Sequence, residues 1–289
     1  MHDMNKESRP LVSIVIPSYN HGNFIQNCIQ SIINQTYQQI ELIIIDDGST
    51  DDSVLKIQEL LDTCKKRFVR FEFRHRLNKG LSATLNEALD WCQGEYYSAI
   101  ASDDVMLERK TATQVELLQK NLDVVAVFGA IELIDNTKKI GEIRQPDKFF
   151  EFKDLIYTEQ FLPAPTQMIR LVKLRETGGY VDNMIIDDWY IYLKLLENDN
   201  RILYVNEIFC KYRVHTGNSF SNPVKMALGR LQVINEFKEH ELFKKTYIKV
   251  CWENAFETLK MDFRLSILVF FTIFFKKVKI VLKKIFGKI

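Results

Sequence analysis

Two adjacent carboxylates, Asp103 and Asp104, follow the apolar stretch 95–101, whose pattern predicts a buried strand. In an open α/β sheet, ligands bind beyond the carboxyl ends of the strands, which is where these acids would emerge. Two acids there repel each other unless a proton or a cation lies between them. Mg²⁺ or Mn²⁺ suits the pair because such cations take oxygen ligands and share them with phosphates. The alternative is that Ser102 and Asp103 cap a following helix.

The chain before these acids alternates between apolar strands and amphipathic helices. Strand patterns cover 11–16, 40–45 and 68–73, and helical spacing of apolar residues separates them. This alternation predicts an α/β fold with a mostly parallel central sheet and helices on both faces. Its loops would bring four polar residues to one edge of the sheet: Asn20, Asp47, Asn78 and Asp103.

That edge has the character of a nucleotide site, although the usual glycine motifs are missing. The first strand is not followed by GxGxxG, and GxxxxGK[ST] does not occur in the sequence. We therefore expect a metal ion, rather than a glycine-rich cradle, to hold the phosphates. A sugar-1-phosphate nucleotidyltransferase would need a glycine-rich loop where Pro17 to Asn20 stands.

The second half of the chain carries further elements. Short strands are expected at 124–128 and 131–134, a helix at 149–162, a strand at 201–215 and two helices within 223–262. Asp187 and Asp188 begin another helix, where they could act as an N-cap and a first-turn acid. The helix dipole would lower the pKa of such a carboxyl, so a catalytic role requires burial or the neighbouring acid to raise it.

Composition excludes several classes of protein. Seven of the 39 basic residues and none of the 38 acidic residues lie in 264–289, so residues 1–263 carry a net charge of −6. That charge argues against binding nucleic acid. The five cysteines form no CxxC pair, which favours reduced thiols in the cytosol over a disulfide framework or a zinc site.

The C-terminal segment 264–289 predicts association with a membrane. Its residues 265–275, apolar except for Ser266 and Thr272, would form a helix about 16 Å long, too short to cross a bilayer of about 30 Å. The following KKVKIVLKKIFGKI places lysines on one helical face and apolar residues on the other, which suits an anionic cytoplasmic leaflet. The alternative is a soluble helix packed on the body of the protein.

Several motifs together resemble family 2 glycosyltransferases, which have the GT-A nucleotide-diphospho-sugar transferase fold and are typical of bacterial polysaccharide and O-antigen synthesis. The matching pieces, in order, are VSIVIPSYN (12–20), ELIIIDDGSTDDS (41–53), NKG (78–80), ASDD (101–104), DDW (187–189) and YRVHTGNS (212–219). PSYN and DDGSTD at this spacing carry most of the specificity. A processive synthase would add several membrane spans and a QxxRW motif, which the sequence lacks.

The resemblance implies a role for each matching residue. The donor-binding residues would be Pro17, Tyr19, Asn20, Asp46, Asp47, Asn78, Gly80 and Asp103. The metal ligands would be Asp103, Asp104 and His215, although a histidine after a strand is more often packed or exposed. Asp188 would be the catalytic base, with Asp187 beside it.

Two positions depart from the family pattern, and two other histidines have no match. Ala101 replaces the first acid of the DxD motif, so metal binding would depend on the two acids after it. Asp187 replaces the usual Glu and has a shorter reach. His21 and His75 are expected at the surface, and Arg76 is a weaker candidate for a nucleotide contact.

We therefore expect an inverting, metal-dependent glycosyltransferase that moves a sugar from a nucleotide-sugar donor, a UDP-sugar by resemblance, to a glycan or lipid-linked glycan in surface polysaccharide synthesis. It would lie peripherally on the cytoplasmic face of the membrane. The expected parts are a disordered 1–10, a catalytic domain at 11–220, helices at 221–263 and the membrane segment at 264–289. The alternative is a non-catalytic, membrane-bound scaffold that binds nucleotide, which only Ala101 supports.

Overall fold

The computed structural model describes residues 9–157, 162–214 and 223–259, which divide into two compact units. The first unit holds the whole sheet within residues 9–152, 162–182 and 191–214. The second unit is helical and comprises 153–157, 183–190 and 223–259. Residues 153–157 and 183–190, which the sequence assigns to the catalytic domain, thus cluster with the C-terminal helices. None of the described helices is both long and apolar enough to cross a membrane.

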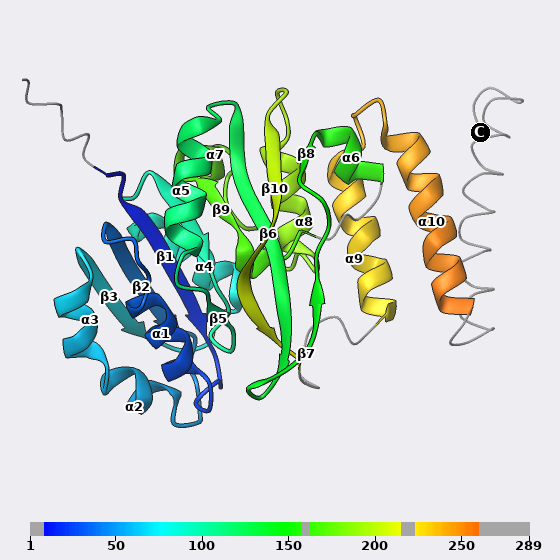
Figure 1. Ribbon diagram of the computed structural model, residues 1–289. Helices are drawn as coiled ribbons and strands as arrows, with labels where there is room; N and C mark the ends of the chain where they lie inside the picture. The colour runs from blue at the N-terminus through cyan, green and yellow to red at the C-terminus, as the bar shows by residue number, and fades with distance from the viewer. Residues whose placement is uncertain (1–8, 158–161, 215–222, 260–289) are drawn as a thin grey trace, which may run out of the picture. The chain divides into compact units, whose positions relative to one another are not determined.

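The strands and helices follow one another along the chain as shown in Figure 1. The strands are β1 (Val12–Ser18), β2 (Ile40–Asp46), β3 (Arg70–His75), β4 (Tyr96–Ala99), β5 (Val105–Met106), β6 (Val124–Asp135), β7 (Lys138–Ile143), β8 (Lys148–Phe150), β9 (Met168–Arg170) and β10 (Arg201–Arg213). The α-helices are α1 (Ile25–Ile33), α2 (Ser53–Gln58), α3 (Leu61–Arg67), α4 (Leu81–Trp91), α5 (Lys110–Lys120), α6 (Phe152–Tyr157), α7 (Leu171–Glu176), α8 (Asp187–Leu195), α9 (Pro223–Glu236) and α10 (Phe243–Leu259).

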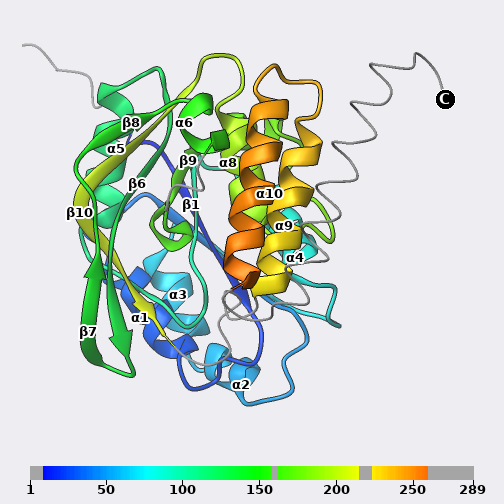
Figure 2. The ribbon, with the colours of Figure 1, turned by 90° about the vertical axis from the view of Figure 1, so that its right-hand side faces the viewer.

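The ten strands form one mixed sheet in the order β3-β2-β1-β4-β9-β6-β10-β5, with β7 paired to β6 and β8 to β10. The pairs β3–β2, β2–β1 and β1–β4 are parallel. The long pair of β6 and β10 is also parallel, and these two strands lie side by side in both ribbon views (Figures 1 and 2). The remaining pairs are antiparallel. The parallel part of the sheet therefore carries the strand ends that the sequence associates with ligand binding.

The core lies where the helices cover the parallel strands. Helix α1 buries Ile25, Cys28, Ile29 and Ile32, which follow the i, i+3, i+4, i+7 spacing of an amphipathic helix. They join alternate residues of β1 and β2 in one apolar cluster, which also includes residues of α2, α3 and α5. This packing fixes the direction in which each strand delivers its C-terminal loop.

Two elements differ from the sequence expectation. The expected break between 128 and 131 is absent, because β6 continues through Gly129 and pairs with β10. A Cβ at Gly129 would lie 2.4 Å from Phe209 Cδ2 and 2.6 Å from the Glu207 carbonyl oxygen. Gly129 thus permits close approach of two strands rather than a turn. The expected helix at 149–162 is wrong at its start, because Phe149 and Phe150 pair with β10 as strand β8.

We predict that Gly129→Ala lowers the free energy of unfolding by about 1–3 kcal/mol, since the methyl group has no space against Phe209. Gly141→Ala in β7 is the matched control, because its Cβ would meet only Leu133 Cδ1, at 3.7 Å. Urea unfolding of both variants and the wild type measures the effect. Equal stability of the two variants would contradict this account of β6.

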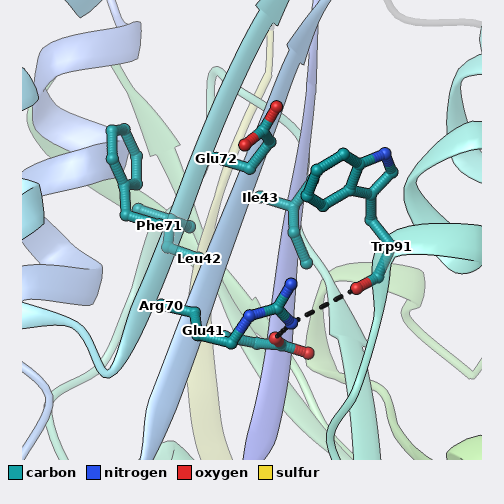
Figure 3. A pocket seen from close by; sticks show the side chains of 7 residues that line it. All are labelled: Glu41, Leu42, Ile43, Arg70, Phe71, Glu72 and Trp91. Atoms are coloured by element: carbon teal, nitrogen blue, oxygen red, sulfur yellow. Dashed lines mark hydrogen bonds and ion pairs between the residues drawn. The ribbon is translucent and has the colours of Figure 1, made fainter.

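A small pocket lies near the beginning of β2 and β3, at the end of the sheet opposite the strand carboxyl termini. Its volume is about 20 Å³, room for one water molecule. Figure 3 shows Arg70 between the carboxylate of Glu41 and the carbonyl oxygen of Trp91. Glu41 is buried and also accepts hydrogen bonds from Ser13 Oγ and the Gly94 backbone N–H. The pocket is therefore lined by an ion pair, Glu41 with Arg70, that has a structural role.

Candidate active site

Three parallel strands deliver their C-terminal loops to one edge of the first unit. Strand β1 lies between β2 and β4, and its register places Ser18 beside Asp46 and Val15 beside Ala99. The loops after these strands begin close together because their strands are neighbours. The edge therefore gathers 19–22, 47–53 and 100–104, as the sequence predicts.

The loop after β1 is joined to the loop after β2 through Asn20. Its backbone N–H donates to Ser49 Oγ at 2.8 Å, and its Oδ1 accepts from the Thr50 backbone N–H at 2.8 Å. Asn20 has a φ of +53°, a left-handed conformation that Asn tolerates better than most residues. Tyr19 is about half exposed and Pro17 partly buried. Asn20 thus shapes the rim, and the Tyr19 side chain remains accessible there.

The adjacent acids Asp46 and Asp47 have different surroundings. Asp46 is fully buried and accepts from Ser18 Oγ at 3.0 Å and from the Ser49 N–H and Oγ at 2.8 and 2.6 Å. These bonds hold the turn after β2. In this structure Asp46 therefore anchors the loop, and its role toward a donor stays a prediction.

Asp47 holds the segment 78–80. Its carboxylate accepts from the Lys79 and Gly80 backbone N–H groups at 2.8 and 2.9 Å and forms an ion pair with Arg76. Arg76 in turn donates to Glu87 at 2.7 Å. Gly48 is required beneath this contact, because it has a φ of +80° and a Cβ there would lie 2.7 Å from Asn78 N. The structure thus brings together Asp47, Asn78 and Gly80, as predicted, and places Arg76, the weaker candidate from the sequence, beside them.

The turn after β4 carries Ser102, Asp103 and Asp104, all buried. Asp104 Oδ1 accepts from the Arg213 backbone N–H at 2.9 Å, whereas Asp104 Oδ2 has no hydrogen-bond partner among the described residues. Burial and the negative charge of Asp103 together raise the pKa of Asp104 well above its usual range. Asp103 is oriented differently, with Oδ1 3.8 Å from Nδ1 of His21.

These two carboxyls fit a divalent cation. A buried carboxylate oxygen without a partner beside a second acid is an arrangement that positive charge stabilises. Within the described ranges, no three His, Cys, Asp or Glu side chains gather into a metal group. A cation held here would therefore take its other ligands from the diphosphate, from water or from His215, which lies outside the described residues.

Sequence reasoning assigned no role to two residues that contact this turn. Arg213 is buried and donates from Nε to the Asp103 carbonyl oxygen at 2.9 Å, besides its backbone bond to Asp104. His21, expected at the surface, has its Nδ1 2.7 Å from Ser102 Oγ and a side chain that is 27% exposed. The position of His21 directly after the PSYN motif is the sequence feature that could have indicated a role at this site. His75 is exposed, as expected.

The two candidate catalytic acids belong to the second unit, where they start helix α8. Asp187 Oδ1 accepts from the Asp188 N–H at 3.0 Å, and Asp188 Oδ1 accepts from the Trp189 N–H at 2.8 Å. Trp189 is buried and its indole N–H donates to the Leu155 carbonyl oxygen at 3.1 Å, which fixes the start of the helix. Burial, with a further contribution from the charge of Asp187, raises the pKa of Asp188 to about 6. Desolvation thus outweighs the backbone hydrogen bonds at the start of the helix, which lower the pKa of Asp188, and the raised pKa suits a general base.

A family model described as glycosyl transferase family 2 matches residues 13–178. The chain therefore belongs to glycosyl transferase family 2, and it is a glycosyltransferase. The matched range includes the loops after β1, β2 and β4 that form the edge described above.

Similar proteins agree with this assignment. A UDP-Glc:α-D-GlcNAc-diphosphoundecaprenol β-1,3-glucosyltransferase, WfgD of Escherichia coli, is 28% identical over 242 residues, covering 82% of this chain and 90% of the relative. Residues 1–349 of TarS of S. aureus, solved in complex with UDP-GlcNAc, superpose with a TM-score of 0.68 at 16% identity, covering 87% of this chain and 73% of that TarS fragment. A mannosyltransferase from Pyrobaculum calidifontis, solved with GDP-Man and Mn²⁺, has a TM-score of 0.67 at 15% identity, covering 98% of this chain and 77% of the neighbour. The expected GT-A fold is thereby confirmed.

Proposed function

We propose that this glycosyltransferase moves a sugar from a UDP-sugar to a hydroxyl of a lipid-linked glycan, with inversion at the anomeric carbon, in surface polysaccharide synthesis. The observation that carries the proposal is the edge where Asp47, the 78–80 segment and the Ser102–Asp104 turn meet at the ends of parallel strands. The activity of WfgD supports the donor and the acceptor class. The UDP-GlcNAc bound by TarS supports the donor as well.

The donor half of the reaction would use the residues of the first unit. Asp47 holds the 78–80 segment through backbone N–H groups and Arg76. A nucleobase N–H group could take the place of these donors to the carboxylate, and a nucleobase C=O group could accept from the backbone N–H groups that are released. Asp103 and Asp104 would hold a divalent cation, which supplies electrostatic stabilisation to the departing nucleoside diphosphate. The Mn²⁺ in the mannosyltransferase complex supports this role of a cation.

The acceptor half would use Asp188 as general base. With a pKa of about 6 its carboxyl is mainly ionised near neutral pH and can still take up a proton readily. It would remove the proton from the acceptor hydroxyl as that oxygen forms a bond to the anomeric carbon. The bond between that carbon and the diphosphate oxygen breaks at the same time, and the leaving diphosphate carries away the electron pair. One displacement of this kind inverts the anomeric configuration.

The test is a screen of the full chain against UDP-, GDP- and other nucleotide sugars, with a GlcNAc-diphospholipid acceptor in detergent and with Mn²⁺, Mg²⁺ or EDTA. Release of the nucleoside diphosphate is measured. We expect one UDP-sugar to be turned over with metal and acceptor and not with EDTA. Turnover in EDTA, or of a GDP-sugar alone, would contradict the corresponding part of the proposal.

We also propose that the protein lies peripherally on the cytoplasmic face of the membrane. The basic amphipathic sequence 264–289, which lies outside the described residues, is the main support. In the second unit, helix α10 adds Ile248 and Trp252, each 40% exposed, four residues apart. Lys244 and Lys245 are exposed on the same helix. Trp and Lys side chains of this kind favour the interface of an anionic bilayer.

Trp252 provides a direct reporter for this proposal. We expect brominated lipids in anionic vesicles to quench the tryptophan fluorescence of the wild type more strongly than that of Trp252→Phe. Trp189 is buried and Trp91 partly buried, so they should contribute little to the difference. Recovery of the full chain in the soluble fraction of cells without detergent would count against membrane association.

A further inference from the structure

His21 lies between the loop after β1 and the turn after β4. Its Nδ1 is 2.7 Å from Ser102 Oγ and 3.8 Å from Asp103 Oδ1. Ser102 is 1% exposed, so its hydroxyl finds its partner inside the protein rather than in water. Ser102 and Asp103 both belong to the turn that carries the candidate metal acids, so the imidazole faces that turn.

The loop that carries His21 is held in place by the loop after β2. The His21 backbone N–H donates to Ser53 Oγ at 3.0 Å, and the Gly22 N–H donates to Asp51 Oδ2 at 2.9 Å. A Cβ at Gly22 would lie 1.8 Å from Asp52 Oδ1, so the two loops meet closely there. The backbone of His21 is thus fixed before any ligand binds, which gives its ring a defined position.

Phe24 connects the imidazole to the other residue that holds this turn. The His21 ring meets the Phe24 ring edge to face, with centroids 6.2 Å apart. The Arg213 guanidinium lies over the same ring, 4.5 Å from its centroid. Because Arg213 also bonds to Asp103 O and Asp104 Oδ1, the turn is held by His21 at Ser102 and by Arg213 beyond it.

We propose that His21 is a positioning residue for Asp103: through Ser102 and the Nδ1 edge of its ring, it orients that carboxylate toward the cation and diphosphate of the donor. This inference rests on the donor site proposed above. The ligand that the oriented Asp103 would bind is a nucleoside diphosphate with a divalent cation.

The test is calorimetric titration of UDP into the full chain with Mn²⁺ present, together with the Mn²⁺ concentration that gives half-maximal turnover. We expect His21→Ala to weaken Mn²⁺-dependent UDP binding by about 10–100-fold, as is typical when the partner of a metal ligand is lost. His21→Asn should recover most of the affinity, since its amide can occupy the place of Nδ1 and bond to Ser102.

His75→Ala is the matched control. His75 also lies 3.8 Å from an aspartate oxygen, that of Asp46, but it is exposed and touches no part of the 102–104 turn in the described structure. We expect its Mn²⁺ dependence to match the wild type. Wild-type affinity in His21→Ala, or an equal loss in His21→Ala and His21→Asn, would overturn the positioning role. Failure of the wild type itself to bind UDP with Mn²⁺ would instead count against the proposed donor site.

Discussion

Asp188→Asn is expected to lower kcat for sugar transfer by about 10²–10⁴-fold, the contribution typical of a general base. The amide keeps the shape of the side chain and an oxygen that can accept from the Trp189 N–H. It cannot accept the proton of the acceptor hydroxyl at neutral pH. Donor binding should remain close to that of the wild type, so the loss belongs to kcat. Steady-state rates at saturating donor and acceptor measure it.

Asp187→Asn separates catalysis from the architecture of the helix terminus. Asp187 is the adjacent acid and makes the equivalent contact with the next backbone N–H, so the same substitution perturbs the helix start similarly. We expect a much smaller loss of kcat. Equal losses in the two variants would contradict the assignment of the base to Asp188.

The pH dependence of the wild type gives a second test of the same residue. Because the pKa of Asp188 is raised to about 6, the carboxyl is ionised above that pH and protonated below it. The rate should therefore fall about tenfold per pH unit below pH 6 and level off above it. Asp188→Asn should lose this acidic limb. A wild-type limb centred near the ordinary pKa of aspartate would argue against the raised pKa of the partly buried Asp188.

Asp103→Asn is expected to lower kcat/KM for the donor by about 10²–10³-fold, as when one preorganised electrostatic stabiliser of a transition state is removed. The amide removes the negative charge that would hold the cation beside Asp104. Mn²⁺-dependent binding of UDP should weaken in parallel. Asp90→Asn, which alters an exposed acid on α4, is the control and should behave as the wild type. Unchanged Mn²⁺ dependence in Asp103→Asn would contradict the cation site.

Much of the site could be predicted because parallel strands bring their carboxyl ends to one edge. The apolar runs of β1, β2 and β4 are almost fully buried, so their position and direction follow from hydrophobic pattern alone. The placement of Asp47 with the 78–80 segment follows in the same way. Pattern does not tell which of two adjacent acids turns inward, and only the structure shows that Asp46 is enclosed by Ser18 and Ser49.

The remaining features depend on contacts between residues distant in sequence. Arg213 reaches the 102–104 turn from 109 and 110 positions away, through the pairing of β10 with β5 and β6. No local spacing of residues in the sequence predicts that pairing of strands. In the sequence, Gly129 similarly suggests a break between two strands. In the structure, a glycine stands there because Phe209 approaches the backbone closely. The raised pKa of Asp188 is also a consequence of burial, which the helix-start pattern alone does not predict.

The central claim is a single displacement in which one carboxylate base activates the acceptor, and the anomeric configuration of the product tests it most directly. The product of the UDP-sugar identified by the screen would be purified, and the proton coupling at its anomeric carbon measured by NMR. The account predicts a configuration opposite to that of the sugar in the donor. The same configuration in donor and product would contradict it, because retention requires a second displacement or a different mechanism.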